Sequence, residues 1–219
     1  MTVALGWLTS PLATVGSENV TLATLLGGLV YLGALIAVAR RVRWAWPAAA
    51  VAAVLFGVEA VAEGLFVDAG IRAVLALLCV YGWRMRRSGA EHRPRSAVGR
   101  EVAYGVVLFA IVTVVAAYAL TDQAADAVAW GSAVVVAAVF VQAAALARGL
   151  AVGWWAVMAS GVVSLVLAAV ASSWPSVLVS AVVVGLGAYG WRRWRSELVA
   201  CAPIDFPAVD EPVDEDLVA

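Results

Sequence analysis

Seven long apolar runs occupy most of this 219-residue chain, and they constrain its fold more than any other feature. They fall at residues 20–39, 46–62, 67–83, 101–120, 127–147, 154–171 and 176–191. Each is close to the roughly 20 residues that a helix needs to cross a bilayer. Runs of this length without period-2 alternation favour spanning helices over barrel strands. We therefore expect seven transmembrane helices.

The composition points to a lipid environment. Hydrophobic residues make up 64% of the chain and charged residues 13%, whereas a soluble domain is about half apolar and about a quarter charged. The seven runs leave only short loops, so there is no room for a separate soluble domain. The expected fold class is an all-α integral membrane protein.

The residue inventory excludes several kinds of chemistry. All 14 basic residues are arginine, so the chain has no lysine for a P-loop, a pyridoxal phosphate Schiff base or a retinal linkage. Cys79, Cys201 and His92 do not form a metal-binding pattern. No nucleophile and base can be paired either. We therefore expect neither an enzyme nor a bound cofactor or metal, and we expect no nucleic-acid partner.

The arginines predict the orientation of the chain. Threading seven spans places every arginine except Arg72 on one side, and acidic residues mark the other side. The first set is Arg40, Arg41, Arg43, Arg84, Arg86, Arg87, Arg93, Arg95, Arg100, Arg148, Arg192, Arg193 and Arg195. The second set is Glu18, Glu63, Asp68, Asp122 and Asp126. The positive-inside rule places the N-terminus outside and the C-terminus in the cytoplasm, in a bacterial-type inner membrane. No arginine precedes Arg40, so we expect no signal peptide.

An internal repeat is the most informative pattern. The segment YGWRMRR at 81–87 recurs as YGWRRWR at 189–195, an offset of 108 residues. At the same offset, Trp46 matches Trp154 and Arg40 matches Arg148. A three-helix unit is therefore used twice, and the extra helix between the copies keeps them parallel. Transporters commonly bind substrate at such a repeat interface, near the middle of the membrane.

This repeat divides the chain into six parts. They are an extracytoplasmic N-terminus (1–19), a first repeat (20–85), a basic cytoplasmic loop (86–100), a connector helix (101–120), a second repeat (126–195) and an acidic tail (196–219). We expect the tail to be disordered, because it is acidic, is interrupted by proline and has no hydrophobic period. Without its six acidic residues from Asp205 to Asp216, the body carries 14 basic and 9 acidic residues, a charge of +5.

Two motifs carry a resemblance to a known family. Trp44-Ala45-Trp46-Pro47 opens the second run and Tyr81-Gly82-Trp83 closes the third. The second copy repeats the theme as Gly153-Trp154-Trp155 and Tyr189-Gly190-Trp191. The chain resembles the PnuC family of vitamin transporters over about residues 20–195. This resemblance implies a 3+1+3 helix order with SWEET-like pseudo-symmetry. It also implies facilitated uptake of nicotinamide riboside or a related compound, trapped by cytosolic phosphorylation, and it allows a homo-oligomer.

The chain departs from the family pattern at several polar positions. Ala45 replaces an asparagine, and Val157 and Gly161 occupy the places of a tryptophan and an aspartate. The run 73–78 is apolar where a glutamine and a tyrosine are expected. The family also includes members that resemble riboflavin, thiamine and deoxynucleoside carriers, so these substrates stay open. A scaffold or sensory protein that does not transport is a further alternative.

The candidate substrate-binding residues are aromatic or polar side chains in or near the spans. They are Trp46, Trp154, Trp155, Gln142, Glu59, Tyr81 and Tyr189. The aromatic rings can stack on a flat ligand ring, and the polar groups can bind a ribose.

Each candidate also has a structural alternative. The aromatic residues lie near the cytoplasmic ends of the spans, where an interfacial aromatic belt is common. Gln142 could form a hydrogen bond between helices. Glu59 could pair with Arg72, for which Asp68 competes at an i, i+4 spacing. Ser132, Ser160 and Ser164 are typical of close helix packing. The expected partners are a small vitamin or nucleoside substrate and membrane lipids.

Overall fold

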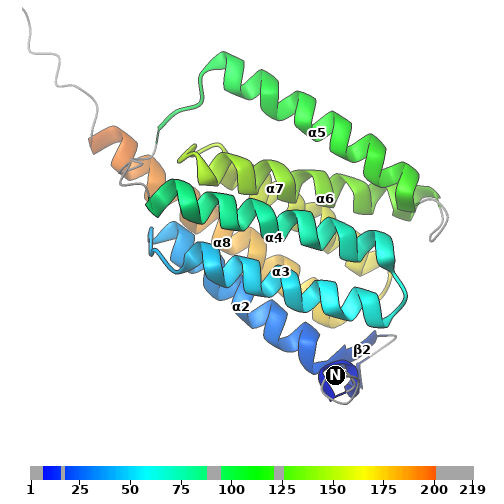
Figure 1. Ribbon diagram of the computed structural model, residues 1–219. Helices are drawn as coiled ribbons and strands as arrows, with labels where there is room; N and C mark the ends of the chain where they lie inside the picture. The colour runs from blue at the N-terminus through cyan, green and yellow to red at the C-terminus, as the bar shows by residue number, and fades with distance from the viewer. Residues whose placement is uncertain (1–6, 16–17, 88–94, 121–125, 201–219) are drawn as a thin grey trace, which may run out of the picture.

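The computed structural model describes residues 7–15, 18–87, 95–120 and 126–200 (Figure 1). Within these ranges, seven helices are long and apolar enough to cross a membrane, as the seven apolar runs predicted. They are α2 (Leu22–Ala39), α3 (Ala45–Ala62), α4 (Phe66–Arg87), α5 (Gly99–Leu120), α6 (Asp126–Ala147), α7 (Gly153–Val170) and α8 (Trp174–Ala200).

A short β-hairpin precedes the first long helix, and the sequence analysis did not anticipate it. Strands β1 (Pro11–Val15) and β2 (Glu18–Thr21) pair antiparallel. Thr21 ends β2 and also caps α2, because its side-chain oxygen accepts a hydrogen bond from the Thr24 backbone N–H at 3.1 Å. The hairpin therefore leads directly into α2.

The helices form two groups of three, with α5 at the edge. Consecutive helices pack together within α2, α3 and α4, and likewise within α6, α7 and α8. Contacts of α4 with α6, and of α2 with α8, join the two groups. The main neighbour of α5 is α6, and α5 lies along one side of the bundle in Figure 1.

The helix boundaries of the two groups recur at an offset of 108 residues. Helix α3 spans 45–62 and α7 spans 153–170, while α4 begins at 66 and α8 at 174. The left-handed residues that interrupt the chain recur as well. Arg41 (φ 57°) matches Gly149 (φ 75°), and Gly64 (φ 78°) matches Ser172 (φ 57°). Such positive φ angles favour glycine. In each group, one of the two positions is a glycine, Gly64 in the first and Gly149 in the second.

A tryptophan ring packs against a glycine in both groups. A Cβ built on Gly82 would lie 2.6 Å from the Trp46 ring, and a Cβ on Gly190 would lie 2.5 Å from the Trp154 ring. Both tryptophans are buried. Because any larger residue would clash, the glycines allow the second and third helices of each group to approach closely.

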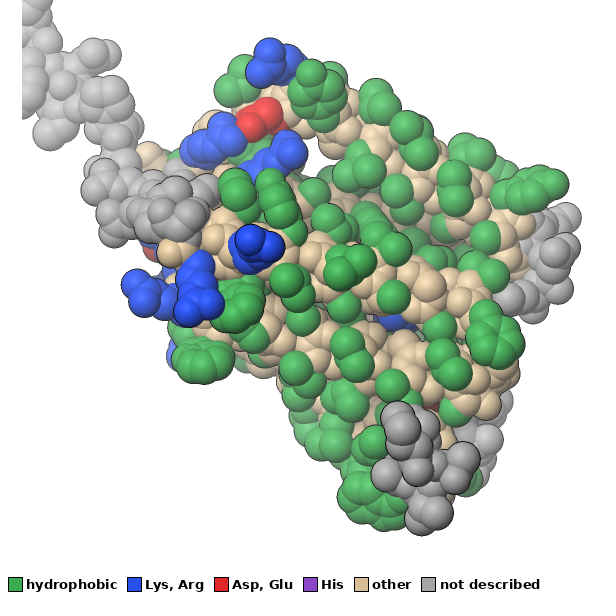
Figure 2. Space-filling model, in the orientation of Figure 1, with side chains coloured by type: hydrophobic (Ala, Val, Ile, Leu, Met, Phe, Trp, Pro, Cys, Tyr) green, Lys and Arg blue, Asp and Glu red, His purple; other side chains and the backbone are tan. Residues whose placement is uncertain are grey.

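The surface is apolar along the helices and basic at one end. Hydrophobic side chains cover most of the face seen in Figure 2, including the outer side of α5. Arginine side chains gather at the end where α4 finishes and α5 begins. This distribution suits a body surrounded by lipid with one basic end in water.

Helix α8 continues past the sequence-predicted start of the tail at residue 196. The helix extends to Ala200, and contacts with other parts of the bundle hold its last turns. Glu197 forms an ion pair with Arg41, and the Trp194 indole Nε1 donates to the Ala39 carbonyl at 3.3 Å. His92, Asp122 and the acidic residues from Asp205 onward lie outside the described residues.

The tryptophan–glycine contact can be tested on α8. Gly190→Ala should destabilise the protein by about 1–3 kcal/mol, because the added methyl group overpacks the core against Trp154. Gly185→Ala is the control on the same helix, because its Cβ would meet nothing within 4 Å. Thermal unfolding of the purified protein in detergent should show a lower midpoint for Gly190→Ala only. Equal midpoints would contradict this role for the glycine.

Candidate functional site

A cavity of about 350 Å³ lies between the two groups of three helices. Its lining comes from α2, α3 and α4 on one side and from α6, α7 and α8 on the other. Helix α5 contributes none of the lining residues. Most of the wall is apolar, with a few polar groups. This volume and composition are those of a site for a small organic molecule.

Most lining positions come in pairs that are 108 residues apart. The pairs are Tyr31 with Val139, Ala34 with Gln142, Leu35 with Ala143, Val38 with Leu146, Ala52 with Ser160, Ala53 with Gly161, Phe56 with Ser164, Arg72 with Ser180, and Leu75 with Val183. Matching surfaces of the two groups therefore face one cavity. The side chains differ within every one of these pairs, so the wall is chemically asymmetric.

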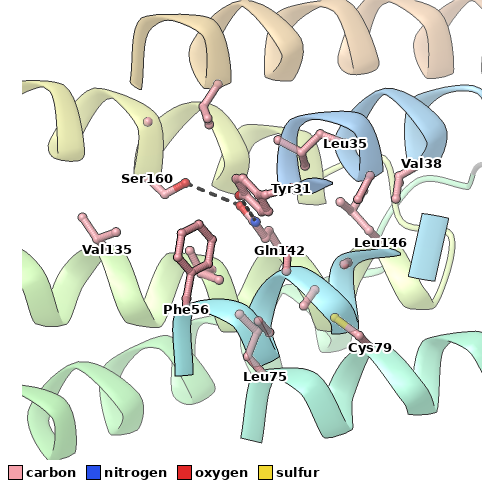
Figure 3. Close-up of a pocket in the computed structure, with 18 of the residues that line it drawn as sticks. Tyr31, Leu35, Val38, Phe56, Leu75, Cys79, Val135, Gln142, Leu146 and Ser160 are labelled. Atoms are coloured by element: carbon pink, nitrogen blue, oxygen red, sulfur yellow. Dashed lines mark hydrogen bonds between the residues drawn. The ribbon is translucent and has the colours of Figure 1, made fainter. Parts of the chain in front are cut away.

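A chain of three polar side chains crosses the cavity wall (Figure 3). The Gln142 side-chain amide donates to the Tyr31 hydroxyl at 3.2 Å, and the Ser160 hydroxyl lies 3.5 Å from the Gln142 carbonyl oxygen. Ser160 also donates to the Val157 carbonyl at 2.9 Å. Gln142 and Ser160 are buried. A serine hydroxyl has a single hydrogen, and that of Ser160 goes to the closer Val157 carbonyl. The Gln142 amide is therefore held by its bond to Tyr31, whose hydroxyl keeps its own hydrogen for another acceptor.

Trp46 contributes an aromatic ring to the cavity wall. It lies at the start of α3, beside Val38 and Cys79 in the same lining. Its indole Nε1 is buried and has no hydrogen-bond acceptor among the described residues. A buried N–H without an acceptor is costly, and the indole Nε1 of Trp154, outside the cavity, is buried without an acceptor in the same way.

Arg72 is the charged residue of the lining. Its guanidinium carbon lies 5.4 Å from the centroid of the Phe56 ring, a cation–π contact. Its Nε lies 3.4 Å from each carboxylate oxygen of Asp68, one turn earlier on α4. Charge-assisted hydrogen bonds are usually about 2.7–2.9 Å long, so this pairing is loose.

The cavity brings together two of the sequence-predicted site residues, Trp46 and Gln142. Trp154 is fully buried outside the lining, and its ring meets that of Trp194 edge-on at 5.6 Å. Trp155 is exposed and contacts the Trp191 ring at 5.5 Å. Tyr81 and Tyr189 are exposed, and neither lines the cavity.

Glu59 also lies outside the lining, near the C-terminal end of α3. Its Oε1 accepts a hydrogen bond from the Thr21 hydroxyl at 2.7 Å and another from the Thr24 hydroxyl. The alternative pair of Glu59 with Arg72 does not form, because Arg72 pairs with Asp68. The hydroxyl groups beside the hairpin thus satisfy the Glu59 carboxylate.

Sequence reasoning missed Tyr31, Phe56 and Ser180, and it treated Arg72 only as an ion-pair partner. A signal was available for Tyr31 and Arg72, because a hydroxyl and a guanidinium inside apolar runs are costly unless they face a polar partner or a cavity. No signal marked Phe56, because nothing in an apolar run shows which face of the helix meets the cavity.

Comparisons with known proteins agree with this architecture. A sequence model described as nicotinamide mononucleotide transporter matches residues 21–196. A crystal structure of the vitamin B3 transporter PnuC superposes with a TM-score of 0.64 at 14% sequence identity. The match covers 81% of this chain and 82% of that chain. No curated protein matches the sequence significantly.

The structural likeness shows the same fold, and the sequence model covers most of the chain. The resemblance to PnuC is therefore confirmed, as is the expectation of a multi-pass membrane protein with seven apolar helices. The chain belongs to the nicotinamide mononucleotide transporter family, whose members are membrane transporters rather than enzymes.

Proposed function

We propose that the protein carries a vitamin-type or nucleoside-type small molecule into the cell by facilitated diffusion. Nicotinamide riboside is the first candidate, and cytosolic phosphorylation would trap it. This proposal rests on the cavity between the two helix groups, whose lining residues occupy matching positions in the two groups. A cavity so placed can open to either side when one group rocks against the other.

The proposed architecture is a 3+1+3 order of two parallel repeats, with α5 as connector. Its support is the recurrence of helix boundaries, left-handed breaks and tryptophan–glycine contacts at an offset of 108. The odd number of helices in each repeat requires a connector to keep the copies parallel. The contacts of α5, which are mainly with α6, suit that role.

The lining supports transport without ion coupling. No aspartate, glutamate or histidine is among the described residues that line the cavity. Proton-coupled carriers usually place such groups along the pathway. The substrate gradient, maintained by phosphorylation inside the cell, would then drive net uptake.

We infer that the protein sits in the cytoplasmic membrane with its N-terminus outside. The support is the collection of arginines at one end of the bundle, which the positive-inside rule assigns to the cytoplasm. The outer end then holds the β-hairpin, and the inner end holds the end of α4 and the start of α5. Most of the basic loop and of the acidic tail lies outside the described residues.

The roles proposed for individual residues follow from the cavity. Trp46 would stack on the flat ring of the substrate, and Gln142 with Tyr31 would bind its polar groups. Trp154 would hold α7 against α8. The exposed Trp155, Tyr81 and Tyr189 would form part of the interfacial belt.

Uptake of labelled compounds into proteoliposomes tests transport directly. Nicotinamide riboside, riboflavin, thiamine and a deoxynucleoside should include at least one substrate, whose uptake rises and then reaches a plateau at equal concentrations. A matching kinase inside the vesicles should remove the plateau, because phosphorylation consumes the free substrate. Ionophores that collapse proton and sodium gradients should leave the initial rate unchanged. Empty vesicles serve as the control, and absence of uptake for every compound would favour a scaffold.

Substitutions in the polar chain test the site. Gln142→Leu and Tyr31→Phe should each raise the apparent Kd for the transported compound about tenfold, because each removes a hydrogen bond worth about 1–1.5 kcal/mol. Ser132→Ala is the matched control on α6, because Ser132 does not line the cavity. Binding is measured by titration of the purified variants. Unchanged affinity in both Gln142→Leu and Tyr31→Phe would place the site elsewhere.

A further inference from the structure

We propose that an anionic phospholipid, such as phosphatidylglycerol, binds on the outside of the bundle at the seam between α2 and α8. Its phosphate lies between Arg40, which follows α2, and Arg193 on α8, at the basic end of the bundle. Its acyl chains run from there along the two helices toward the middle of the membrane. The site lies outside the cavity, so it does not depend on the proposed transport.

The two arginines are held beside each other by contacts between the helix groups. The Trp194 indole Nε1 donates to the Ala39 carbonyl at 3.3 Å, and these residues adjoin Arg193 and Arg40 in the chain. The Tyr189 hydroxyl accepts a hydrogen bond from Arg193 Nη1 at 3.3 Å, and the Arg40 guanidinium donates to the same hydroxyl. Two guanidinium groups from different halves therefore converge on one uncharged oxygen.

No carboxylate of the described residues neutralises these two cations. Glu197 is the only acidic residue of α8, and the segment 22–58 contains none. Glu197 pairs with Arg41, so neither Arg40 nor Arg193 forms an ion pair within the described residues. Both side chains are exposed. An anion that contacts both would relieve their repulsion, and a phosphate diester offers one free oxygen to each guanidinium.

The helix surface next to the arginines is open toward the middle of the membrane. Gly33 lies on the same face of α2 as Arg40, seven residues earlier, and Gly185 lies eight residues before Arg193 on α8. A Cβ on either glycine would meet nothing within 4 Å. At 1.5 Å per residue, these open positions are about 10 and 12 Å from the arginines along the helix axes. An acyl chain below a bound headgroup would pass at this depth.

The seam also has the apolar surface that a lipid requires. Ile36 on α2 is 37% exposed, and Val182 on α8 is 47% exposed. Helix α5 packs mainly along α6, on the far side of the bundle from α2 (Figure 1). The surface thus changes from two arginines at the basic end to apolar side chains further in, which is the order of phosphate and acyl chain in a phospholipid. A free phosphate would use the arginines alone.

The corresponding seam between α4 and α6 provides a matched control. Arg148 occupies the position that matches Arg40, but Met85 stands where α8 has Arg193. A phosphate at that seam would meet one arginine of the pair, and the Glu101 carboxylate already interacts with Arg148. We therefore expect tight binding at the α2–α8 seam only.

Lipid titration of the purified full-length protein, followed by native mass spectrometry, tests the site. Phosphatidylglycerol and phosphatidylcholine with the same acyl chains are added separately to delipidated protein in detergent. The wild-type protein should retain one phosphatidylglycerol per chain about tenfold more tightly than phosphatidylcholine, because choline offsets the phosphate charge. Bound phosphatidylglycerol should also raise the thermal midpoint, because its phosphate joins two helices. Glycerol 3-phosphate at the same concentration should not displace it, because it lacks acyl chains.

The variants separate this site from diffuse attraction to the basic end. Arg40→Gln and Arg193→Gln should each weaken phosphatidylglycerol binding about tenfold, whereas Arg148→Gln should change it less than twofold. Arg40→Lys keeps the charge and should bind more tightly than Arg40→Gln. Because Arg40→Lys is the milder change, it decides the matter, by binding more weakly than the wild type, if Arg40→Gln does not fold.

Several outcomes would overturn the lipid site. Equal retention of the two lipids, or equal losses in all three glutamine variants, would leave only a general charge effect. Displacement by glycerol 3-phosphate would make the ligand a free phosphate. Retention only by a chain that ends at Ala200 would show that the acidic tail occupies the arginines. A changed oligomeric state in the Arg40 and Arg193 variants, with unchanged lipid retention, would make this face an interface between copies.

Discussion

Both halves of the bundle depend on a tryptophan ring lying against a glycine backbone. In a lipid environment, apolar side chains gain little from leaving the solvent, so helices associate through close packing and hydrogen bonds. Trp46 against Gly82, and Trp154 against Gly190, provide such packing between the second and third helices of each half. The cavity described above lies between the two groups of three helices. A second hollow, of about 280 Å³, lies between α3 and α4 within the first group.

The same contact serves different purposes in the two halves. Trp46 is part of the cavity wall, and its N–H has no acceptor among the described residues. Trp154 is sealed instead by the edge-on ring of Trp194, which also donates to the Ala39 carbonyl of the first half. A matched pair of tryptophans therefore does not act as a symmetric clamp on a ligand. One ring lines the cavity, and the other packs against Trp194, which joins the two halves through its hydrogen bond to Ala39.

The sequence predicted the helices well and the site only in part. Lengths and breaks were readable because a span must be apolar throughout and must end at charge, glycine or proline. The sequence does not show which face of a span meets the cavity, because all faces are apolar. For this reason it could not show that Trp46 lines the cavity and that Trp154 does not. Glu59 looked exposed to substrate because its partner Thr21 ends a hairpin that the sequence analysis did not anticipate, and its partner Thr24 lies in the next turn, in α2. Gln142 was identifiable because an amide deep in a span is costly.

Because the two halves carry different side chains, the two sides of the cavity are chemically different. If both copies carried the same side chains, a ligand could bind in two equivalent orientations, and neither end of it would be distinguished. Here the counterpart of Gln142 is Ala34, and the counterpart of Arg72 is Ser180. The amide and the guanidinium come from different halves, so a ligand that contacts both is fixed in one orientation. If the protein transports by the rocking movement proposed above, relative movement of the halves would separate these two polar groups and so weaken binding of such a ligand.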